Sequence, residues 1–241
     1  RKGAQNGDFV HKPDAEMFRE LNKASGGIVK LLAIAPEVEG AKECIEELKD
    51  EVVLSVAHTM ADYEQAKEAF EHGVHHVTHL YNAMAGLSHR KPGVVGAAAD
   101  DEHVEAEMIC DGVHIHPATV RQTFKMFGDD RIIMISDSME ATGMPDGDYA
   151  LGGQKVIKKG HLATLEDGTI AGSATNLMDC VRVVVQKMNI PLESAVKCAA
   201  VNSAKSVGIY DQYGSITPGK TANMVLLKEK DLSTKQVILK G

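Results

Sequence analysis

The sequence lacks the features that would identify several classes of protein. Its 241 residues hold four cysteines and no C-x-x-C pair, so we expect reduced, structural thiols in a cytoplasmic protein rather than a disulfide framework. No apolar run approaches the roughly 20 residues of a membrane-spanning helix, and no signal-peptide pattern is present, which argues against a membrane partner. The net charge of −8 argues against a nucleic-acid partner.

An initiator methionine is also absent. Residues 1–8 are polar, include two glycines and resemble the interior of a loop. Near the other end, segments 223–227 and 236–239 have strand patterns, but two strands alone are only marginally stable. We therefore expect these tail strands to join a partner sheet that this sequence does not supply, as part of a longer protein.

Apolar segments of strand length recur through the first 136 residues, with helical patterns between them. Strands are expected at 28–34, 52–56, 75–78, 104–109 and 131–136. The first three begin 24 and 23 residues apart, which is the repeat of a βα unit. Near-continuous apolar strands predict a parallel sheet covered by helices. Because no Gly-x-Gly-x-x-Gly fingerprint is present, we favour a (β/α)-barrel over an open nucleotide-binding sheet.

The pattern changes after residue 143. Short strand-like segments joined by glycine-bearing turns predict a β-hairpin insertion near 148–171. We expect residues 1–218 to form a partial TIM-barrel catalytic domain that carries this insertion. Residues 219–241 would be the C-terminal strands of a small flanking β-sandwich.

Two of the expected strands lead directly into a histidine. His58 follows the segment 52–57 and His79 follows 75–78, so the two residues are 21 positions apart. Because the carboxyl ends of neighbouring parallel strands meet at one mouth, both imidazoles are candidate ligands of a divalent metal there. The alternative is that they only line the mouth of the sheet.

Two further strand ends carry groups suited to chemistry. Asp137 follows the segment 131–136, where it is either a general base that moves a proton from water to a leaving amine or a turn residue. His114 lies between a strand and the helix that Pro117 begins, in position to contact a substrate. His116, directly before that helix, is a candidate helix cap.

A small-residue turn and a basic segment follow His79. Asn82 and Ala83 lie in the turn, and Arg90 lies in the basic segment His-Arg-Lys that comes next. Backbone N–H groups of such a turn and a guanidinium together suit a phosphate group, although a solvated basic loop is the alternative. Glu37, at the end of the first strand, is the acidic candidate for a third metal ligand.

Several segments together resemble the N-acetylglucosamine-6-phosphate deacetylase family of the amidohydrolase superfamily. They are 1–6, 35–37, 57–59, 78–84, 111–114 and 171–173. The segment Thr-His-Leu-Tyr-Asn-Ala-Met at 78–84 is the most specific, whereas 214–223 is shared by many amidohydrolases. The resemblance implies a (β/α)-barrel of the metal-dependent hydrolase type, incomplete at its start, with a flanking β-sandwich and a homodimeric assembly.

The resemblance also implies a role for each matching residue. His58 and His79 would bind a divalent metal, zinc first and iron, cobalt, manganese or nickel as alternatives. Asp137 would be the catalytic acid/base. The substrate-binding residues would be Asn82, Ala83, Arg90 and His114. In the family the third protein ligand is a glutamate in a Leu-Glu-Gly-Pro motif, which this sequence does not contain, and its role does not transfer to Glu37.

This sequence departs from the family pattern at two places. Ser136 and Ser138 flank Asp137 where the family commonly has Thr-Asp-Ala, so we expect altered tuning of the same chemistry. Gln5 stands where some members carry a histidine near the sugar.

The expected reaction is metal-dependent hydrolysis of the acetamide of the sugar phosphate N-acetyl-D-glucosamine 6-phosphate to D-glucosamine 6-phosphate and acetate. Two alternatives stay open, namely another amidohydrolase that acts on a different amide and a catalytically incomplete binding protein. Other amidohydrolases commonly carry a lysine that bridges two metals, and no lysine ends a strand here.

Overall fold

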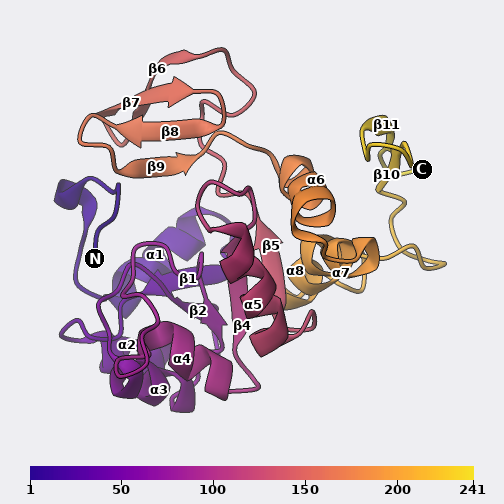
Figure 1. The fold of residues 1–241 in the computed structure, drawn as a ribbon. Helices are drawn as coiled ribbons and strands as arrows, with labels where there is room; N and C mark the ends of the chain where they lie inside the picture. Colours follow the sequence, from indigo (N-terminus) through magenta and orange to yellow (C-terminus); the bar gives the residue numbers. More distant parts are fainter.

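Five parallel strands form the central sheet of the protein, in the order β1-β2-β3-β4-β5 (Figure 1). The computed structural model describes residues 1–241. The strands are β1 Leu31–Ile34, β2 Val53–Val56, β3 His76–Val77, β4 Glu105–Ile109 and β5 Ile132–Ile135. Each pairs in parallel with the next strand along the chain, as the βα repeat predicts. The sheet therefore carries the five successive strand ends on one edge.

One helix precedes the first strand, four connect the strands, and together they cover one face of the sheet (Figure 1). They are α1 Ala15–Ala24, α2 Ala41–Leu48, α3 Tyr63–Glu71, α4 Gly93–Asp100 and α5 Pro117–Phe127, after a short 3-10 turn, η1, at Gly7–Phe9. The Asp62 side chain caps α3 and forms a capping box with Gln65. His116 caps α5, as expected, by accepting the Ala118 N–H at 3.2 Å.

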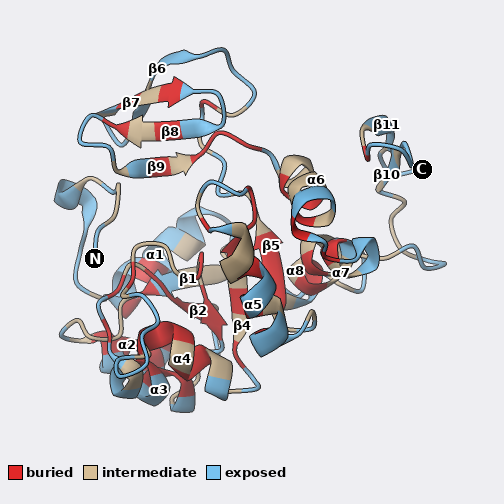
Figure 2. Cartoon of the chain, in the orientation of Figure 1, coloured by how far each residue is buried: buried red, intermediate tan, exposed pale blue.

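The two faces of the sheet differ in polarity. The strands of the central sheet are largely buried (Figure 2). Leu54, Val77 and Met108 lie on one face of the sheet and are almost completely buried in the main hydrophobic core. The opposite, inner face carries Ser55 and His76, which lie in register on neighbouring strands. Because side chains alternate along a strand, the covered face supplies the hydrophobic core and the inner face holds polar groups.

Residues 147–173 form a second sheet, above the carboxyl-terminal ends of the first (Figure 1). Its antiparallel strands are β6 Gly147–Leu151, β7 Gln154–Lys159, β8 Leu162–Leu165 and β9 Ile170–Ser173. Backbone hydrogen bonds tie β9 to the loop after β5: the Ser173 N–H donates to the Asp137 carbonyl at 2.7 Å, and the Met139 N–H donates to the Ser173 carbonyl at 3.0 Å. The insertion is thereby attached to a strand end of the central sheet.

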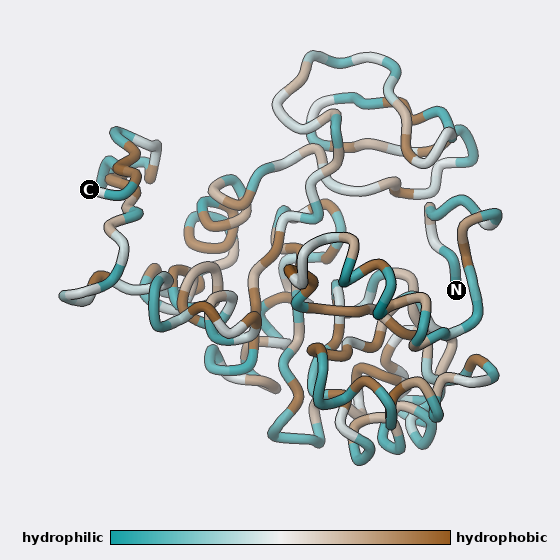
Figure 3. Tube along the Cα trace, turned by 180° about the vertical axis from the view of Figure 1, so that it is seen from behind, coloured by the Kyte–Doolittle hydropathy of each residue, from teal (hydrophilic) through white to brown (hydrophobic).

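The remaining elements follow in chain order. They are α6 Leu177–Met188, α7 Leu192–Val196, a π-helical turn Lys197–Val201, α8 Asn202–Ser206, β10 Met224–Leu227 and β11 Thr234–Ile238. The antiparallel β10–β11 hairpin stands away from the central sheet (Figures 1 and 3). It exposes Val225, Val237 and the following Leu239. The proposed division into domains at residue 218 stays a prediction. None of the helices has the length and apolar character needed to cross a membrane.

Candidate active site

His58 and His79 meet at the carboxyl-terminal edge of the sheet. Their Nε2 atoms are 3.0 Å apart, and the two rings stand nearly edge to face, with an interplanar angle of 76°. Burial lowers the pKa of both imidazoles, and each ring also lies near another histidine, which lowers the pKa further. The neutral form that binds metals is therefore the favoured form of both rings.

The second nitrogen of each ring tests whether this pair suits a metal. His58 Nδ1 lies 3.1 Å from the Lys2 carbonyl, to which it can donate a proton, and this arrangement leaves the Nε2 lone pair toward His79. His79 Nδ1 is buried without a hydrogen-bond partner. Two imidazole nitrogens that face one point fit two ligands of a first-row divalent metal. No group of three histidine, cysteine or acidic side chains is suitably placed around one point, whereas a catalytic zinc usually has three protein ligands.

The backbone around the histidine pair adopts an unusual conformation. Only eight non-glycine residues of the chain have positive φ, and five of them line one cavity of about 470 Å³. These five are His58, His79, Tyr81, Ala83 and Asp137. Left-handed backbone at a non-glycine residue is strained and persists only where the surroundings impose it, which makes such a cluster typical of a functional site.

The same cavity contains most of the predicted site residues. Asn82, Ala83, His114 and Asp137 line it together with both histidines, whereas Arg90 does not. Arg90 is exposed in the loop before α4, so its predicted phosphate contact has no counterpart within this cavity. Arg1 and Gln5 also contribute to the lining.

The position of Asp137 depends on the insertion. Its φ is +52°, and its backbone carbonyl accepts the Ser173 N–H from β9. Gly172, also in β9, has φ +135°, and a Cβ atom there would come within 3.4 Å of the Asp137 carbonyl oxygen. The 3.4 Å separation is an ordinary contact, so it is the positive φ, which residues with side chains rarely adopt, that favours glycine at position 172.

Glu37 occupies a supporting position rather than a ligand position. Its carboxylate accepts the Thr59 hydroxyl at 2.5 Å and the Met60 N–H at 2.6 Å. These contacts anchor the loop that carries His58. They also explain why Thr59 does not begin the next helix, a role that belongs to Asp62.

A polar pair, buried His76 and half-buried Glu107, was not singled out in the sequence and lies on the inner face below the histidines. His76 Nε2 is 3.8 Å from Glu107 Oε1, and His76 Nδ1 contacts the Ser55 hydroxyl at 2.9 Å. Burial lowers the pKa of His76 to about 4 and raises that of Glu107 to about 7. Both groups are therefore neutral in the folded protein over mildly acidic pH. The feature of the sequence that could have pointed to Glu107 is its place as a polar residue at an alternate position of β4.

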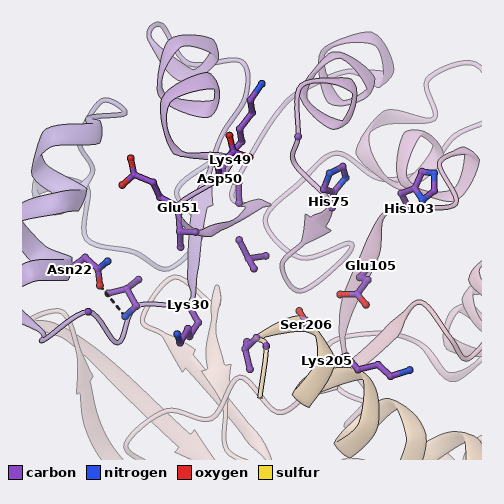
Figure 4. Close-up of a pocket in the computed structure, with 18 residues that line it drawn as sticks. Asn22, Lys30, Lys49, Asp50, Glu51, His75, His103, Glu105, Lys205 and Ser206 are labelled. Carbon is purple, nitrogen blue, oxygen red and sulfur yellow. Dashed lines mark hydrogen bonds between the residues drawn. The ribbon is translucent and has the colours of Figure 1, made fainter. Parts of the chain in front are cut away.

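A larger cavity, of about 630 Å³, lies at the opposite end of the strands. Its charged lining mixes both signs (Figure 4) and includes Lys30, Lys49, Asp50, Glu51, His75, His103, Glu105 and Lys205. The residues with positive φ in this lining are Gly27, Gly73 and Gly208. The larger cavity is therefore not the one with the strained backbone, which lies at the other end of the strands.

Comparison with known sequences gives a consistent relationship. Residues 2–241 match the amidohydrolase family. The chain is 39% identical over 228 residues to N-acetylglucosamine-6-phosphate deacetylase from Bacillus subtilis (strain 168), covering 94% of this chain and 58% of that protein. It is 36% identical over 241 residues to N-acetylgalactosamine-6-phosphate deacetylase from Escherichia coli O157:H7, covering 96% and 63% respectively.

Solved structures agree with the sequence relatives. A mutant N-acetyl-D-glucosamine-6-phosphate deacetylase from Mycobacterium smegmatis, in complex with N-acetyl-D-glucosamine-6-phosphate, is 35% identical with a TM-score of 0.94 and covers 99% of this chain and 64% of its own. The Thermotoga maritima N-acetylglucosamine-6-phosphate deacetylase has a TM-score of 0.90 at 32% identity, covering 100% and 64%. The chain thus spans about 60% of the length of these relatives.

These matches confirm the expected (β/α)-barrel architecture, of which this chain contains five parallel strands. They extend over nearly the whole chain, including the strand ends that carry His58, His79 and Asp137. The chain belongs to the amidohydrolase family.

Proposed function

We propose that the protein hydrolyses the acetamide of N-acetyl-D-glucosamine 6-phosphate to D-glucosamine 6-phosphate and acetate. The observation that carries this proposal is the group of five strained residues around one cavity, which include the two histidines and Asp137. The named activity of the sequence relatives supports the choice of substrate.

His58 and His79 would hold a divalent metal through their facing Nε2 atoms, with zinc as the first candidate. When bound, such a metal supplies Lewis-acid chemistry, which polarises a carbonyl group and lowers the pKa of water. The Lys2 carbonyl orients the His58 ring, and Glu37 holds the loop behind it.

Asp137 would move the proton. Water attacks the acetamide carbonyl carbon while the Asp137 carboxylate takes a proton from the water. Asp137 then returns this proton to the sugar nitrogen as the C–N bond breaks, so that acetate and the free amine leave. The contact between β9 and the Asp137 carbonyl would hold the carboxylate over the histidine pair.

The sugar phosphate would be bound at the turn after His79. Asn82, Ala83 and His114 line the cavity where the amide must lie, which suits contacts to the sugar. Arg90 would bind the phosphate, and its exposed position means that this contact requires either a rearrangement of its loop or a site outside this cavity.

Assembly as a homodimer and a cytoplasmic location belong to the same proposal. All four cysteines are free and buried, which fits a reducing compartment. Light scattering coupled to size-exclusion chromatography would measure the mass of the assembly directly, and a monomeric mass would contradict the dimer.

The proposal is tested by acetate release from the full chain loaded with zinc. We expect release from N-acetylglucosamine 6-phosphate, less from its galacto epimer and much less from unphosphorylated N-acetylglucosamine. The variant His79→Asn should lose both bound zinc and activity. Zinc binding without acetate release from either sugar phosphate would favour the binding-protein alternative, and equal turnover of the unphosphorylated sugar would remove the phosphate site.

A further inference from the structure

Asp111 is a buried acidic residue that the proposed reaction does not use directly. Its side chain is 0% exposed and that of His114 is 5% exposed. Asp111 lies just after β4, and its one ionic partner is the His114 ring, with Asp111 Oδ2 2.8 Å from His114 Nδ1. Burying a carboxylate beside no lysine or arginine is costly unless its hydrogen bonds are satisfied.

The two oxygens of Asp111 have separate contacts. Oδ1 accepts the backbone N–H groups of Val113 at 2.8 Å and His114 at 2.9 Å, which closes the turn. Oδ2 accepts from the His114 ring and, at 3.4 Å, from the Ser173 hydroxyl. Burial alone would raise the pKa of Asp111, but these hydrogen bonds from His114 and Val113 outweigh it and lower the pKa. The carboxylate form is the one that accepts them all.

A carboxylate can only accept hydrogen bonds, so a His114 ring that carries one proton must carry it on Nδ1. The other nitrogen, Nε2, is then a lone-pair acceptor, and it is the ring nitrogen left for the cavity that His114 lines. A closed turn requires only Oδ1. The contact through Oδ2 therefore needs a separate explanation.

Ser173 connects this arrangement to Asp137. Its hydroxyl contacts Asp111 Oδ2, and its backbone N–H holds the Asp137 carbonyl. One residue of β9 thus touches both the carboxylate behind His114 and the loop of the proposed acid/base.

We propose that Asp111 is a positioning residue that fixes His114 in its Nδ1–H tautomer, so that Nε2 accepts a hydrogen bond from a hydroxyl group of the amino-sugar substrate. Ser173 holds Asp111 in this orientation and sets it relative to Asp137. The substrate contact rests on the proposed deacetylase function, whereas the tautomer is a property of the chain itself.

The test uses Asp111→Asn in the full, zinc-loaded chain labelled with ¹⁵N-histidine. Asparagine can keep the turn by accepting both backbone N–H groups through its oxygen, but its NH₂ group then faces His114 Nδ1 and requires the Nε2–H tautomer. We expect ¹⁵N NMR to show Nδ1–H in the parent protein and Nε2–H in the variant, with the His114 signal assigned by its loss in His114→Gln.

The matched control is Asp101→Asn. Asp101 Oδ1 also accepts a backbone N–H two residues on, that of His103 at 2.9 Å, without contacting an imidazole. This variant should leave the His114 tautomer and the KM unchanged. Asp111→Asn should raise the KM for N-acetylglucosamine 6-phosphate about tenfold and change kcat less than about threefold, the size expected for one lost hydrogen bond.

The outcomes separate the two proposals. An Nε2–H tautomer in the parent protein, or the same tautomer in parent and Asp111→Asn, overturns the positioning role whatever the activity. The parent measurement does not depend on Asp111→Asn, because its signal is assigned with His114→Gln, so the test stands even where Asp111→Asn fails to fold. A reversed tautomer in a protein that releases no acetate supports the positioning of His114 and overturns the deacetylase. A reversed tautomer with an unchanged KM overturns the substrate contact.

Discussion

The two ends of the central sheet both open into cavities, but different residues hold left-handed backbone at each end. At the amino-terminal end the positive φ angles fall on Gly27, Gly73 and Gly208, which adopt them without strain. At the carboxyl-terminal end Gly3 and Gly172 also have positive φ, but five residues with side chains do so as well, including His58, His79 and Asp137. Strain of about 1–2 kcal/mol per residue is tolerated where it directs a side chain.

The two cavities also differ in size and in the parts of the chain that line them. The amino-terminal cavity is larger and is lined by side chains of both charges, yet none of its non-glycine residues has a positive φ. The smaller cavity gathers residues that follow four strands, β2 to β5, together with residues from the start of the chain and from the β6–β9 sheet. Convergence of elements distant in sequence, rather than cavity volume, distinguishes the candidate site.

The largest expected effect is that of removing the proposed proton carrier at the carboxyl-terminal end of the sheet. A matched aspartate at the amino-terminal end serves as the control. Asp137→Asn should lower kcat by about 10²–10⁴-fold, because an amide cannot accept the proton. Asp50→Asn, in the opposite cavity, should leave kcat unchanged. Acetate release and zinc content measured together check this, and a parallel loss of zinc in Asp137→Asn would contradict the shuttle role.

A prediction of intermediate size concerns the pH dependence of stability that arises from His76 and Glu107, on the inner face between the two ends of the sheet. With folded pKa values of about 4 for His76 and about 7 for Glu107, against ordinary values of 6.5 and 4.5, the folded and unfolded pair each hold one proton between pH 4.5 and 6.5. The pair therefore adds no pH dependence to stability in that window.

Glu107→Gln breaks this balance. Only His76 then titrates: it stays neutral when folded and gains a proton when unfolded below pH 6.5. Its contribution is fully present above pH 6.5 and is lost as the pH falls toward 4, by about 3 kcal/mol relative to the parent. Urea unfolding of both proteins at several pH values measures this, and parallel stability curves would show that the two groups do not titrate as a compensating pair.

The smallest effect tests the left-handed residues themselves. Gly73→Ala should lower the free energy of unfolding by more than about 1 kcal/mol, because φ is +108° and the new Cβ would approach Lys49 Cβ to 3.1 Å. Ala83→Gly should change it by less than about 1 kcal/mol, since relief of strain offsets the added freedom of the unfolded chain. Urea titrations measure both changes. Equal destabilisation by Gly73→Ala and Ala83→Gly would contradict the distinction between unstrained glycines at one end and strained residues at the other.

Much of the central sheet was predictable because its strands are short apolar runs at a regular spacing. Helix α4 was not predicted, because Gly93–Asp100 consists of small and apolar residues without a polar period. The start of α3 was not predictable from the local pattern either: Thr59 and Asp62 are both possible capping residues, but Asp62 pairs with Gln65, while the Thr59 hydroxyl donates to Glu37, a partner 22 residues away. Local patterns do not reveal such distant competitors for a hydrogen bond.

The candidate site was predictable in part for the same reason. Strand ends identified His58, His79 and Asp137, and the structure brings the two histidines together. Asp111 and Glu107 were not singled out, because their importance depends on burial beside a particular imidazole. Arg90 looked well placed in the sequence but does not reach the cavity.

The amino-acid sequence by itself determined the alternation of strands and helices and the residues that follow each strand, since both depend on neighbours within a few positions. Tertiary structure alone decided which ring nitrogens face each other, which carboxylate is buried behind His114 and which residue of β9 donates to the Asp137 carbonyl. The histidine contact joins residues 21 positions apart, and Asp111, although only three positions from His114, also contacts Ser173, 62 positions away. The geometry of such contacts is set by the packing of the whole sheet.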